Sequence, residues 1–461
     1  MVFSSLLFIY FFLPIFFLLY FIIKNRKYRN TILLLFSLFF YAYGEPVYIL
    51  LMVLSIVANY YLAILIDKYR SKKIFVLDIA FNLGLIAVFK YFNFFLDNIN
   101  NLFNLNINFI NIVLPIGISF YTFQIMTYVI DVYKKEVPVQ KNIILLGCYI
   151  CSFPQLIAGP IVRYSTVNEE LKDRKENLND IADGARRFIL GLSKKVLIAN
   201  GAAFICEHIL FLGGATYGFI GALLIAVSYT IQIYFDFSGY SDMAIGLGRI
   251  LGFHYLENFN YPYIASSITD FWRRWHISLS SFFKDYVYIP LGGNRVKKIL
   301  NIRNLIIVWA LTGLWHGASW NFIFWGLYYG IILIIEKFLL KDKLSKIPKL
   351  CQHIYALILI VIGWVIFLSV DLATLKDLLS SLIGMNGLGK IHVLVSTQTL
   401  TVRYMIPLVL GIIFSMPIYP KIKKALHKNS YILDILLVML LLLSSWIITV
   451  DSYNPFIYFR F

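Results

Sequence analysis

Long apolar runs alternate with short polar loops along the whole sequence. A helix needs about 20 apolar residues to cross a bilayer, and several of the runs reach that length. Lys and Arg gather in the loops at residues 24–29, 67–73 and 134–135, whereas the Asn-rich loop 97–108 has neither. Because cytoplasmic loops carry the excess of basic residues, this alternation predicts a multi-pass helical membrane protein whose N-terminus lies outside.

The apolar pattern predicts about 12 helical membrane spans. The first run continues to Ile23 without a preceding basic residue, which favours a membrane helix over a cleaved signal peptide. The expected spans cover approximately residues 3–23, 31–43, 47–66, 74–96, 109–132, 188–212, 217–236, 304–320, 322–340, 353–370, 402–418 and 431–450.

Two segments depart from this pattern. Residues 143–162 are apolar, but they have basic residues on both sides and contain Pro154 and Gly159-Pro160, so we expect a re-entrant segment. The charged stretch 169–187 predicts an amphipathic cytoplasmic helix or loop. The sequence shows no internal repeat, which argues against the inverted-repeat architecture of many transporters.

Composition and charge narrow the class of function. The chain is 60% hydrophobic and 14% charged, whereas soluble domains are roughly 25% charged. The net charge of +17 comes from bases in the short loops rather than from a separate basic stripe, so we expect no nucleic-acid binding. Cys148 and Cys151 form a C-x-x-C, but no second pair or adjacent His completes a metal site, and small buried hydrophobes are expected instead.

Charged and aromatic residues crowd the segment 259–295 at a density that a lipid-facing helix would not tolerate. On a helix, Asp270, Arg273 and Arg274 are three or four residues apart and can pair on one face. Because ionisable groups inside a membrane are costly, the segment is a candidate functional site. The alternative is an interfacial helix with Trp anchors, whose arginines reach lipid phosphates.

His316 forms a second candidate centre, with Gly313 and Gly317 close by. It lies about 12 residues into the expected span 304–320, or about 18 Å from its basic start, which is near mid-membrane. The glycines thin the helix and open space for another chain or a substrate. A desolvated neutral histidine can take a proton from a hydroxyl and pass it to a leaving thiolate. The alternative is a buried histidine bonded to a neighbouring helix.

Six of the eight tryptophans lie between Trp272 and Trp325, around His276 and His316. Such rings could form the wall of a tunnel for an apolar acyl carrier. They could equally anchor two helix ends at the membrane interface. The sequence leaves both interpretations open.

Several separated motifs resemble the membrane-bound O-acyltransferase family, specifically its bacterial alginate O-acetylase type. The matching segments are residues 152–163, 235–244, 259–295, 311–330 and 454–461. The resemblance implies an all-α polytopic fold, with a ring of about 11–12 tilted transmembrane helices, plus re-entrant and amphipathic helices, around a central funnel. We expect a single membrane domain over 1–461, with N-terminal helices 1–140, a catalytic core at about 141–340 and C-terminal helices 341–461.

The resemblance also implies which residues act. The near-invariant histidine of the family falls on His316, and its second polar active-site position falls on His276. The donor would be acetyl-CoA at the cytoplasmic face, with no bound cofactor and no metal. Arg273, Arg274, Lys284 and Arg295 are expected to meet the donor phosphates, and Asp270, Trp315 and Asn321 to support the core. Asn200 is a departure, because many relatives have an acid there, which puts an acid-dependent role in doubt.

The expected function is therefore O-acetyl transfer across a bacterial cytoplasmic membrane. In this branch a separate extracytoplasmic acetylase of the SGNH type usually places the acetyl group on a polysaccharide hydroxyl. Peptidoglycan O-acetylation and D-alanylation of teichoic acid are alternatives within the family, although the teichoic-acid relatives lack the block 259–295 as it stands here. A glycan transporter or flippase is the alternative from another class, but it does not explain the two His-Trp centres.

Overall fold

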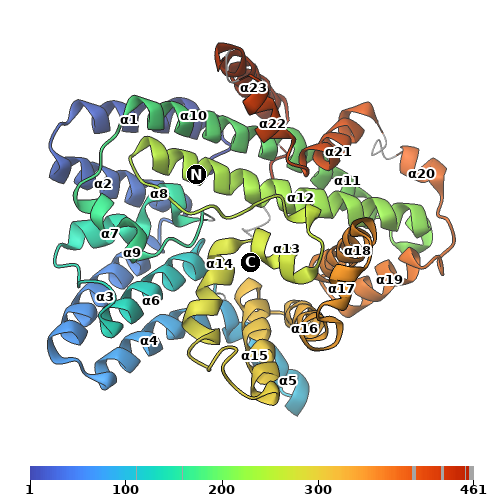
Figure 1. The fold of residues 1–461 in the computed structure, drawn as a ribbon, viewed down its shortest axis with the longest axis horizontal. Helices are drawn as coiled ribbons and strands as arrows, with labels where there is room; N and C mark the ends of the chain where they lie inside the picture. Colours follow the sequence, from blue (N-terminus) through green and yellow to red (C-terminus); the bar gives the residue numbers. More distant parts are fainter. Residues whose placement is uncertain (111, 158, 397–400, 427–429, 452, 456–461) are drawn as a thin grey trace. The chain divides into compact units, whose positions relative to one another are not determined.

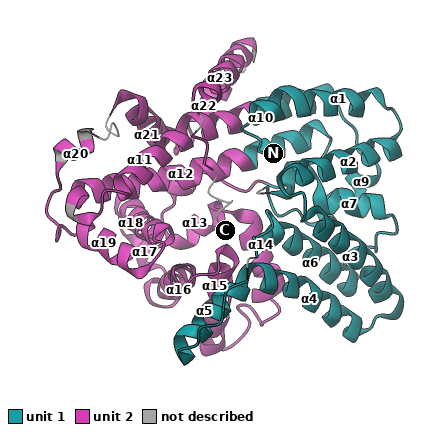
Figure 2. Cartoon of the chain, turned by 180° about the vertical axis from the view of Figure 1, so that it is seen from behind, with its two compact units in different colours: residues 1–188, 241–256 teal, residues 189–240, 257–461 magenta. Residues whose placement is uncertain are grey.

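The computed structural model describes residues 1–110, 112–157, 159–396, 401–426, 430–451 and 453–455, and all regular structure within them is helical (Figure 1). The helices group into two compact units (Figure 2). Unit 1 contains residues 1–188 and 241–256, and unit 2 contains residues 189–240 and 257–461. The expected all-α polytopic fold is confirmed. Ala158 and residues 456–461, which belong to two of the motifs, lie outside the described residues.

Unit 1 is built around phenylalanine rings. The Phe153 ring lies edge-on to Phe12 and Phe16, with centroids 5.3 and 5.0 Å away. Each edge-to-face pair adds about 0.5–1.5 kcal/mol beyond the area it buries. The helices of unit 1 are a π-helical turn Phe8–Phe12, α1 Leu13–Ile22, α2 Arg26–Gly44, α3 Ile49–Tyr69, α4 Lys72–Ile86, a π-helical turn Ala87–Tyr91, α5 Phe92–Phe103, α6 Ile118–Lys134, α7 Ile143–Cys151, α8 Phe153–Leu156, α9 Tyr164–Lys172, most of α10 Leu178–Ser193, and the end of α12 Gly214–Ile250.

The segment expected to be re-entrant, 143–162, does not form one long helix. Helix α7 stops at Cys151, α8 is only four residues long, and the described residues after α8 are not helical up to residue 163. Polar side chains bond the backbone at the break: Phe153 N donates to Ser37 Oγ over 3.0 Å, and Gln155 Nε2 donates to Tyr149 O over 2.6 Å. These bonds supply the partners that buried non-helical backbone needs.

Glu176, in the loop between α9 and α10, fastens this loop to α1 and α2. Its carboxylate accepts hydrogen bonds from Tyr20 at 2.6 Å, from Arg26 at 2.5 and 2.9 Å, and from Arg29 at 2.8 Å. Burial alone would raise the pKa of Glu176, but the hydrogen bonds from Arg26 and Tyr20 outweigh it and lower the pKa to about 2. The carboxylate is therefore charged at neutral pH.

The charged stretch 169–187 is largely helical, and the span expected to start at residue 188 starts earlier. The apolar helix that contains α10 runs over Leu178–Leu210. Asp180, in its first turn, pairs with Arg249 of α12 over 2.9 Å, within unit 1. Of the two expected forms, amphipathic helix or loop, most of the stretch takes the helical one, and Asp180 is paired against a neighbouring helix.

Unit 2 carries both histidine centres. Its helices are the end of α10, a π-helical turn Lys194–Ala199, α11 Asn200–Leu210, most of α12, a 3₁₀ turn Pro262–Ile264, α13 Ile268–Arg274, α14 Ile277–Phe283, a π-helical turn Lys284–Tyr288, α15 Lys298–His316, α16 Trp320–Ile335, a π-helical turn Glu336–Leu340, α17 Lys343–Lys346, α18 Lys349–Leu368, α19 Leu372–Leu382, α20 Ile391–Ser396, α21 Val402–Phe414, α22 Ile418–Ala425 and α23 Ser430–Val450.

Helices α15 and α16 form a tight hairpin in unit 2. A Cβ on Gly313 would lie 2.2 Å from Phe322 O, and one on Gly326 would lie 2.2 Å from Trp309 O. Only glycine allows this approach of the two backbones. The space that Gly313 opens is therefore filled by the backbone of α16.

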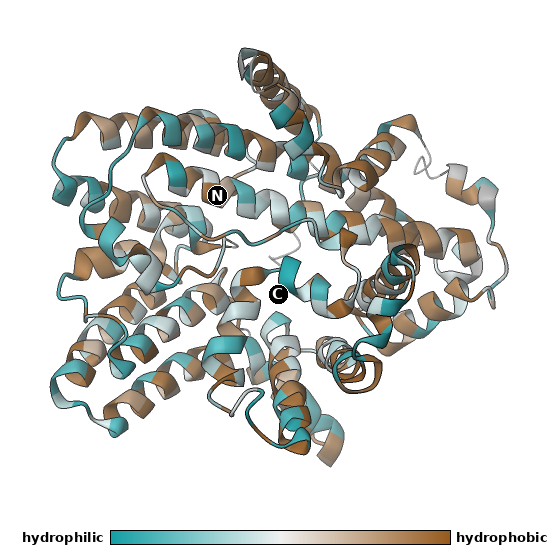
Figure 3. Ribbon diagram, viewed as in Figure 1, coloured by the Kyte–Doolittle hydropathy of each residue, from teal (hydrophilic) through white to brown (hydrophobic). Residues whose placement is uncertain are grey.

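Within the described residues, eight helices are long and apolar enough to cross a membrane, or nine if α21 and α22 form one bent span. The apolar pattern predicts about 12. Helix α6, expected as a span, has only 17 residues and is almost wholly buried in unit 1. Hydropathy alone does not separate a helix inside the protein from one facing lipid. Helix α23, by contrast, is apolar along nearly its whole length (Figure 3).

Candidate active site

His276 occupies a sharp break between α13 and α14. Its backbone is left-handed, with φ 43° and ψ 56°, a conformation that is uncommon outside glycine and must be held by surrounding contacts. The preceding loop provides them. Ile277 N donates to Asn258 O over 3.0 Å, and Asn260 N donates to Arg274 O over 2.9 Å. The loop thus clamps both sides of the break.

The His276 side chain is completely buried in unit 2. Its Nδ1 lies 3.2 Å from Asn258 Oδ1, and the Phe237 ring packs edge-on with centroids 4.6 Å apart. Its Nε2 is also buried and has no hydrogen-bond partner among the described residues. Burial lowers the pKa of His276 to about 3, so the imidazole is neutral at physiological pH.

His316 is the last residue of α15 and is buried, with 3% of its surface exposed. The chain leaves the helix at Gly317, which is fully extended, and α16 starts at Trp320. The expectation of a mid-span histidine is therefore wrong. Because α15 starts at Lys298, His316 lies about 27 Å along the helix from its first residue at 1.5 Å per residue.

The Trp315 indole connects the two histidines. Its centroid lies 5.6 Å from the His276 ring and 4.9 Å from the His316 ring. His316 also meets the rings of Trp325 and Phe367 edge-on, at 4.8 and 5.1 Å. Trp315, expected only as a supporting residue, is thus the side chain that the two candidate centres share.

The tryptophan cluster lies mostly inside unit 2. Of the six tryptophans from residue 272 to residue 325, five are buried and Trp320 is half exposed. The Trp272 ring lies 4.6 Å from Trp309 and 5.6 Å from Trp325. These distances describe an interior aromatic wall, and only Trp320 has the exposure expected of an interface anchor.

The basic residues expected at the donor site differ in their surroundings. Arg274 pairs with Asp270 over 2.9 Å, as their spacing predicts, and its Nη1 reaches Asn260 O at 3.4 Å. Arg273 is exposed and forms no ion pair with a described residue. Arg295 is exposed as well. Arg274 therefore helps to hold the loop, whereas Arg273 and Arg295 face solvent or lipid.

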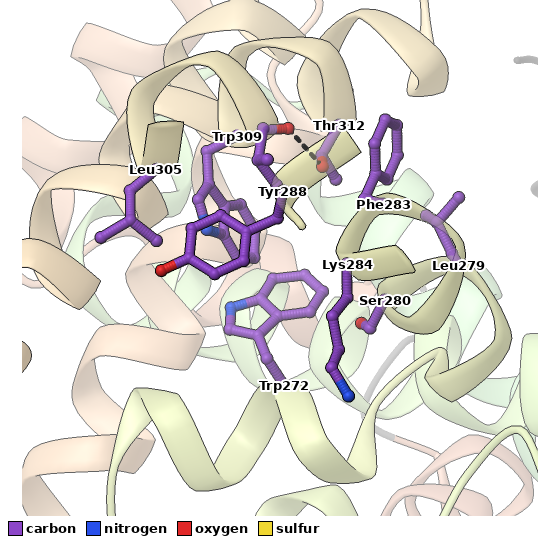
Figure 4. A pocket seen from close by; sticks show the side chains of 10 residues that line it. Trp272, Leu279, Ser280, Phe283, Lys284, Tyr288, Leu305, Trp309 and Thr312 are labelled. Carbon is purple, nitrogen blue, oxygen red and sulfur yellow. Dashed lines mark hydrogen bonds between the residues drawn. The ribbon is translucent and has the colours of Figure 1, made fainter. Parts of the chain in front are cut away.

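A cavity of about 170 Å³ opens between α13, α14 and α15 (Figure 4). Its lining residues are Trp272, Leu279, Ser280, Phe283, Lys284, Tyr288, Leu305, Val308, Trp309 and Thr312. Ser280 is one helical turn after His276, and Thr312 is one turn before His316. The cavity therefore lies one turn from each histidine, and Lys284 is the one expected donor-binding residue in its lining.

Two polar residues discussed above have partners within unit 2. Asn321 is buried in the first turn of α16 and accepts a hydrogen bond from Ser319. Asn200 donates to Asn454 Oδ1 over 3.3 Å and to Tyr453 O over 3.4 Å. The amide of Asn200 thus bonds the C-terminal segment.

Asn258 and Glu336 contact the site, although the sequence did not single them out. Glu336 accepts from Ile268 N at 2.7 Å and from Thr269 N at 2.8 Å, at the start of α13. A carboxylate inside the apolar run 331–340 was an available signal. Asn258 carried none, because a neutral amide in a loop is common.

Metal-binding geometry is not found in the part of the chain that the structure describes: no group of three or more His, Cys, Asp or Glu could hold an ion there. Cys148 and Cys151 are both buried free thiols. Cys148 Sγ donates to Asn30 O over 3.0 Å. Their surroundings are those of small buried side chains.

Comparison with known proteins gives the family. The model of the membrane-bound O-acyltransferase family matches residues 141–370. The chain is 38% identical to the probable alginate O-acetylase AlgI of Azotobacter vinelandii, over 100% of both proteins. It is 39% identical to the peptidoglycan O-acetyltransferase of Helicobacter pylori, over 85% of this chain and 81% of that protein. With the teichoic acid D-alanyltransferase of Bacillus subtilis it shares 31% identity over 50% of this chain and 60% of that protein.

The matched region contains both histidines, Trp315 and the cavity. The similarity to the alginate O-acetylase extends beyond this region to the whole chain. The resemblance carried by the sequence motifs is therefore confirmed. The chain belongs to the membrane-bound O-acyltransferase family, in its alginate O-acetylase-like type, and is a multi-pass membrane enzyme that transfers acyl groups.

Proposed function

We propose that this enzyme takes acetyl from acetyl-CoA on the cytoplasmic side and delivers it for O-acetylation of an extracytoplasmic polysaccharide. One observation carries the proposal: the buried rings of His276 and His316 both contact the Trp315 indole. Each histidine is one helical turn from a residue that lines the aromatic cavity, and Lys284 lines the same cavity. Two relatives are named for O-acetyl transfer to alginate and to peptidoglycan, which supports acetyl as the group transferred.

The chemistry requires a base and then an acid. In the proposed reaction, His316 takes the proton of an acceptor hydroxyl, which belongs to the external acetylase that later passes the acetyl group on, while the hydroxyl oxygen attacks the thioester carbonyl carbon. The C–S bond then breaks, and the thiolate takes up that proton, which leaves an O-acetyl ester and free CoA. His276 positions the reactants or relays the proton. The buried aromatic wall excludes water that would otherwise hydrolyse the thioester.

Lys284 has the strongest support as a donor-binding residue. Figure 4 shows it beside Ser280 and Trp272 at the cavity. An ammonium attracts the phosphates of the donor, and the aromatic rings suit its thioester arm. Arg273 and Arg295 are exposed and are further candidates for the phosphates. We assign Arg274 to the loop, because Asp270 already pairs with it.

The acceptor side completes the proposal. We place the enzyme in the cytoplasmic membrane of a bacterium, with an SGNH-type acetylase outside that passes the acetyl group to the glycan. The similarity to the D-alanyltransferase extends over only half of this chain, so D-alanylation is the weaker reading. A transporter is not needed to explain the chain, because the family transfers acyl groups.

Sealed membrane vesicles from cells that make the enzyme and its native glycan test the proposal. Acetyl-CoA with a labelled acetyl group is added to the medium around the vesicles, which are either inside-out or right-side-out. The label that alkali releases from the glycan is then counted. Labelling from inside-out vesicles only, lost in His316→Gln, supports the proposal. Equal labelling from right-side-out vesicles, or labelling that survives His316→Gln, contradicts it.

A further inference from the structure

Asn258 is fully buried, and donors surround its side-chain oxygen. Oδ1 lies 3.1 Å from Ser278 N, 2.9 Å from Ser278 Oγ and 3.2 Å from His276 Nδ1. The backbone oxygen of Asn258 also accepts from Ile277 N. One residue therefore contacts both the backbone turn at His276 and the imidazole ring itself.

These contacts determine the orientation of the Asn258 amide. A backbone N–H is always a donor, so the atom that faces Ser278 N must be the amide oxygen and not the NH₂ group. In the reversed orientation the buried NH₂ group of Asn258 would face the N–H of Ser278, and two buried donors without an acceptor are costly in free energy. Oδ1 is therefore the atom that also faces His276.

The orientation of the amide in turn decides which nitrogen of His276 carries the proton. An amide oxygen only accepts, so Nδ1 must donate to it. Ser278 Oγ does not compete, since it lies 3.5 Å from Nδ1 but 2.9 Å from Asn258 Oδ1, to which it donates. A neutral imidazole has one N–H, and Nε2 is left with a lone pair.

We propose that Asn258 is a positioning residue that holds His276 as its Nδ1–H tautomer, which makes Nε2 the proton-accepting atom of the His276 ring. Nε2 is buried without a hydrogen-bond partner among the described residues, so it is available to a substrate or a second group. The ring is faced by Asn258 and Ser278 and by the rings of Phe237 on α12 and Trp315 on α15, and none of these side chains is charged. Orientation rather than a neighbouring charge therefore sets the proton-accepting atom.

The role of Nε2 in catalysis rests on the proposed function. In that reaction His316 takes the proton of the acceptor hydroxyl, the oxygen bonds to the acetyl carbon and the C–S bond breaks. The proton passes from His316 to Nε2 of His276 and from there to the thiolate. Nδ1 keeps its own proton throughout, donated to Asn258. The opposite tautomer could not accept at Nε2, so the proton would reach the thiolate without help from His276 and transfer would be slower.

Nitrogen NMR of the enzyme with ¹⁵N-labelled histidine tests the tautomer without using activity. The His276 signals are assigned by their absence in His276→Gln. We expect a protonated Nδ1 and a bare Nε2 in the wild type at pH 7, and a protonated Nδ1 again in Asn258→Asp, which keeps an acceptor. Asn258→Leu should show a mixture or the opposite tautomer. A protonated Nε2 in the wild type, or an unchanged spectrum in Asn258→Leu, overturns the proposal.

Asn59→Leu is the matched control. Asn59 is equally buried, in unit 1, and its amide bonds Asn82. Asn59→Leu removes a buried amide, as Asn258→Leu does, but its His276 signals should remain those of the wild type. A matching change in the control would make the effect at Asn258 a general loss of packing and would overturn the positioning role. If Asn258→Leu does not fold, the wild-type and Asn258→Asp spectra still decide the tautomer.

Acetyl-transfer kinetics separate positioning from simple structure. Asn258→Leu should lower kcat about 100-fold, with the KM for acetyl-CoA unchanged, because a general acid–base step is lost. Asn258→Asp should restore most of the rate at pH 7 and move the acid limb of the kcat profile to higher pH, since a carboxylate beside Nδ1 favours the imidazolium. Equal losses in both variants contradict the positioning role. A wild type that transfers nothing from acetyl-CoA defeats the proposed function and leaves the tautomer result standing.

Discussion

The Glu336 carboxylate lies across the start of α13 and accepts both the N–H and the hydroxyl of Thr269, over 2.8 and 2.6 Å. Ile268 N donates to the same carboxylate over 2.7 Å. The first N–H groups of a helix have no partner inside it, and an acid there also favours the helix dipole. Because α13 leads directly into the break at His276, Glu336 fixes where the helix before that break begins.

Replacing Glu336 by Ala should destabilise the enzyme and reduce its activity. The change leaves two N–H groups without their partner, at a cost of about 1–3 kcal/mol for each buried group. Thermal unfolding of the detergent-solubilised enzyme measures the loss. Glu336→Gln keeps an acceptor oxygen and should lose less, and Glu169→Ala, at an exposed glutamate, should change nothing. Equal unfolding temperatures for Glu336→Ala and Glu169→Ala would show that the hydrogen bonds from the start of α13 to Glu336 do not stabilise the enzyme.

His316→Ala should abolish acetyl transfer while expression and membrane insertion stay intact. The imidazole is buried against Trp315, Trp325 and Phe367, so its removal also opens a cavity. His316→Gln, which fills more of that space, separates lost chemistry from lost packing. Transfer by the purified variants from acetyl-CoA is the measurement, and near-wild-type transfer by either variant would show that His316 is not the base.

His276→Ala should reduce transfer strongly but less completely than His316→Ala. The reason is that we assign His276 to positioning or proton relay, whereas His316 takes the first proton. Rates of the two variants are compared at saturating acetyl-CoA. An unchanged rate in His276→Ala would make His276 purely structural, and total loss in both variants would contradict the unequal roles.

Charge reversal at Lys284 should raise the KM for acetyl-CoA with a smaller effect on kcat. Phosphate contacts mostly stabilise the bound ground state, so their loss weakens binding more than chemistry. Lys284→Glu is compared with Arg295→Glu, whose side chain does not line the cavity, and with Lys73→Glu, an exposed lysine of unit 1. We expect the largest rise in Lys284→Glu and none in Lys73→Glu. The donor site lies elsewhere if Lys284→Glu behaves like Lys73→Glu.

Glu176 should make stability depend on acid pH. Its pKa is lowered in the folded state to about 2 from an ordinary value of 4.5, so the unfolded chain binds this proton more readily. The stabilisation is present in full above pH 4.5 and is lost as the pH falls towards 2. Unfolding temperatures between pH 7 and pH 3 should fall more steeply below pH 4.5 in the wild type than in Glu176→Gln. Parallel curves for the wild type and Glu176→Gln would show that the hydrogen bonds to Glu176 do not stabilise the folded state.

The class of protein was predictable from the sequence because it depends on neighbouring residues. Apolar length and loop charge are properties of consecutive positions, so the multi-pass helical fold followed from them. The Trp and Gly residues next to His276 and His316 in the sequence, such as Trp275, Trp315 and Gly317, were also visible without a structure. The family resemblance rested on the same local motifs.

Span boundaries were less predictable, because they depend on what each helix packs against. Helix α10 crosses α12 within unit 1 where a Cβ on Gly184 would lie 2.5 Å from Gly246 O. The two glycines belong to separate segments, and neither predicts the other. In the same way, the apolar run of α6 shows only that its residues avoid water, and burial in protein satisfies that as well as lipid does.

The supporting contacts of the site were decided by tertiary packing. Asn258 and His276 meet across a loop, Glu336 meets Thr269 from another helix, and Trp315 links the two histidines. A hydrophobic pattern indicates which face of a segment is buried, but not which partner it meets, because hydrophobic burial has no direction. Hydrogen bonds do have direction, so the tautomer of His276 and the cap of α13 were settled only when the chain brought these distant donors and acceptors together.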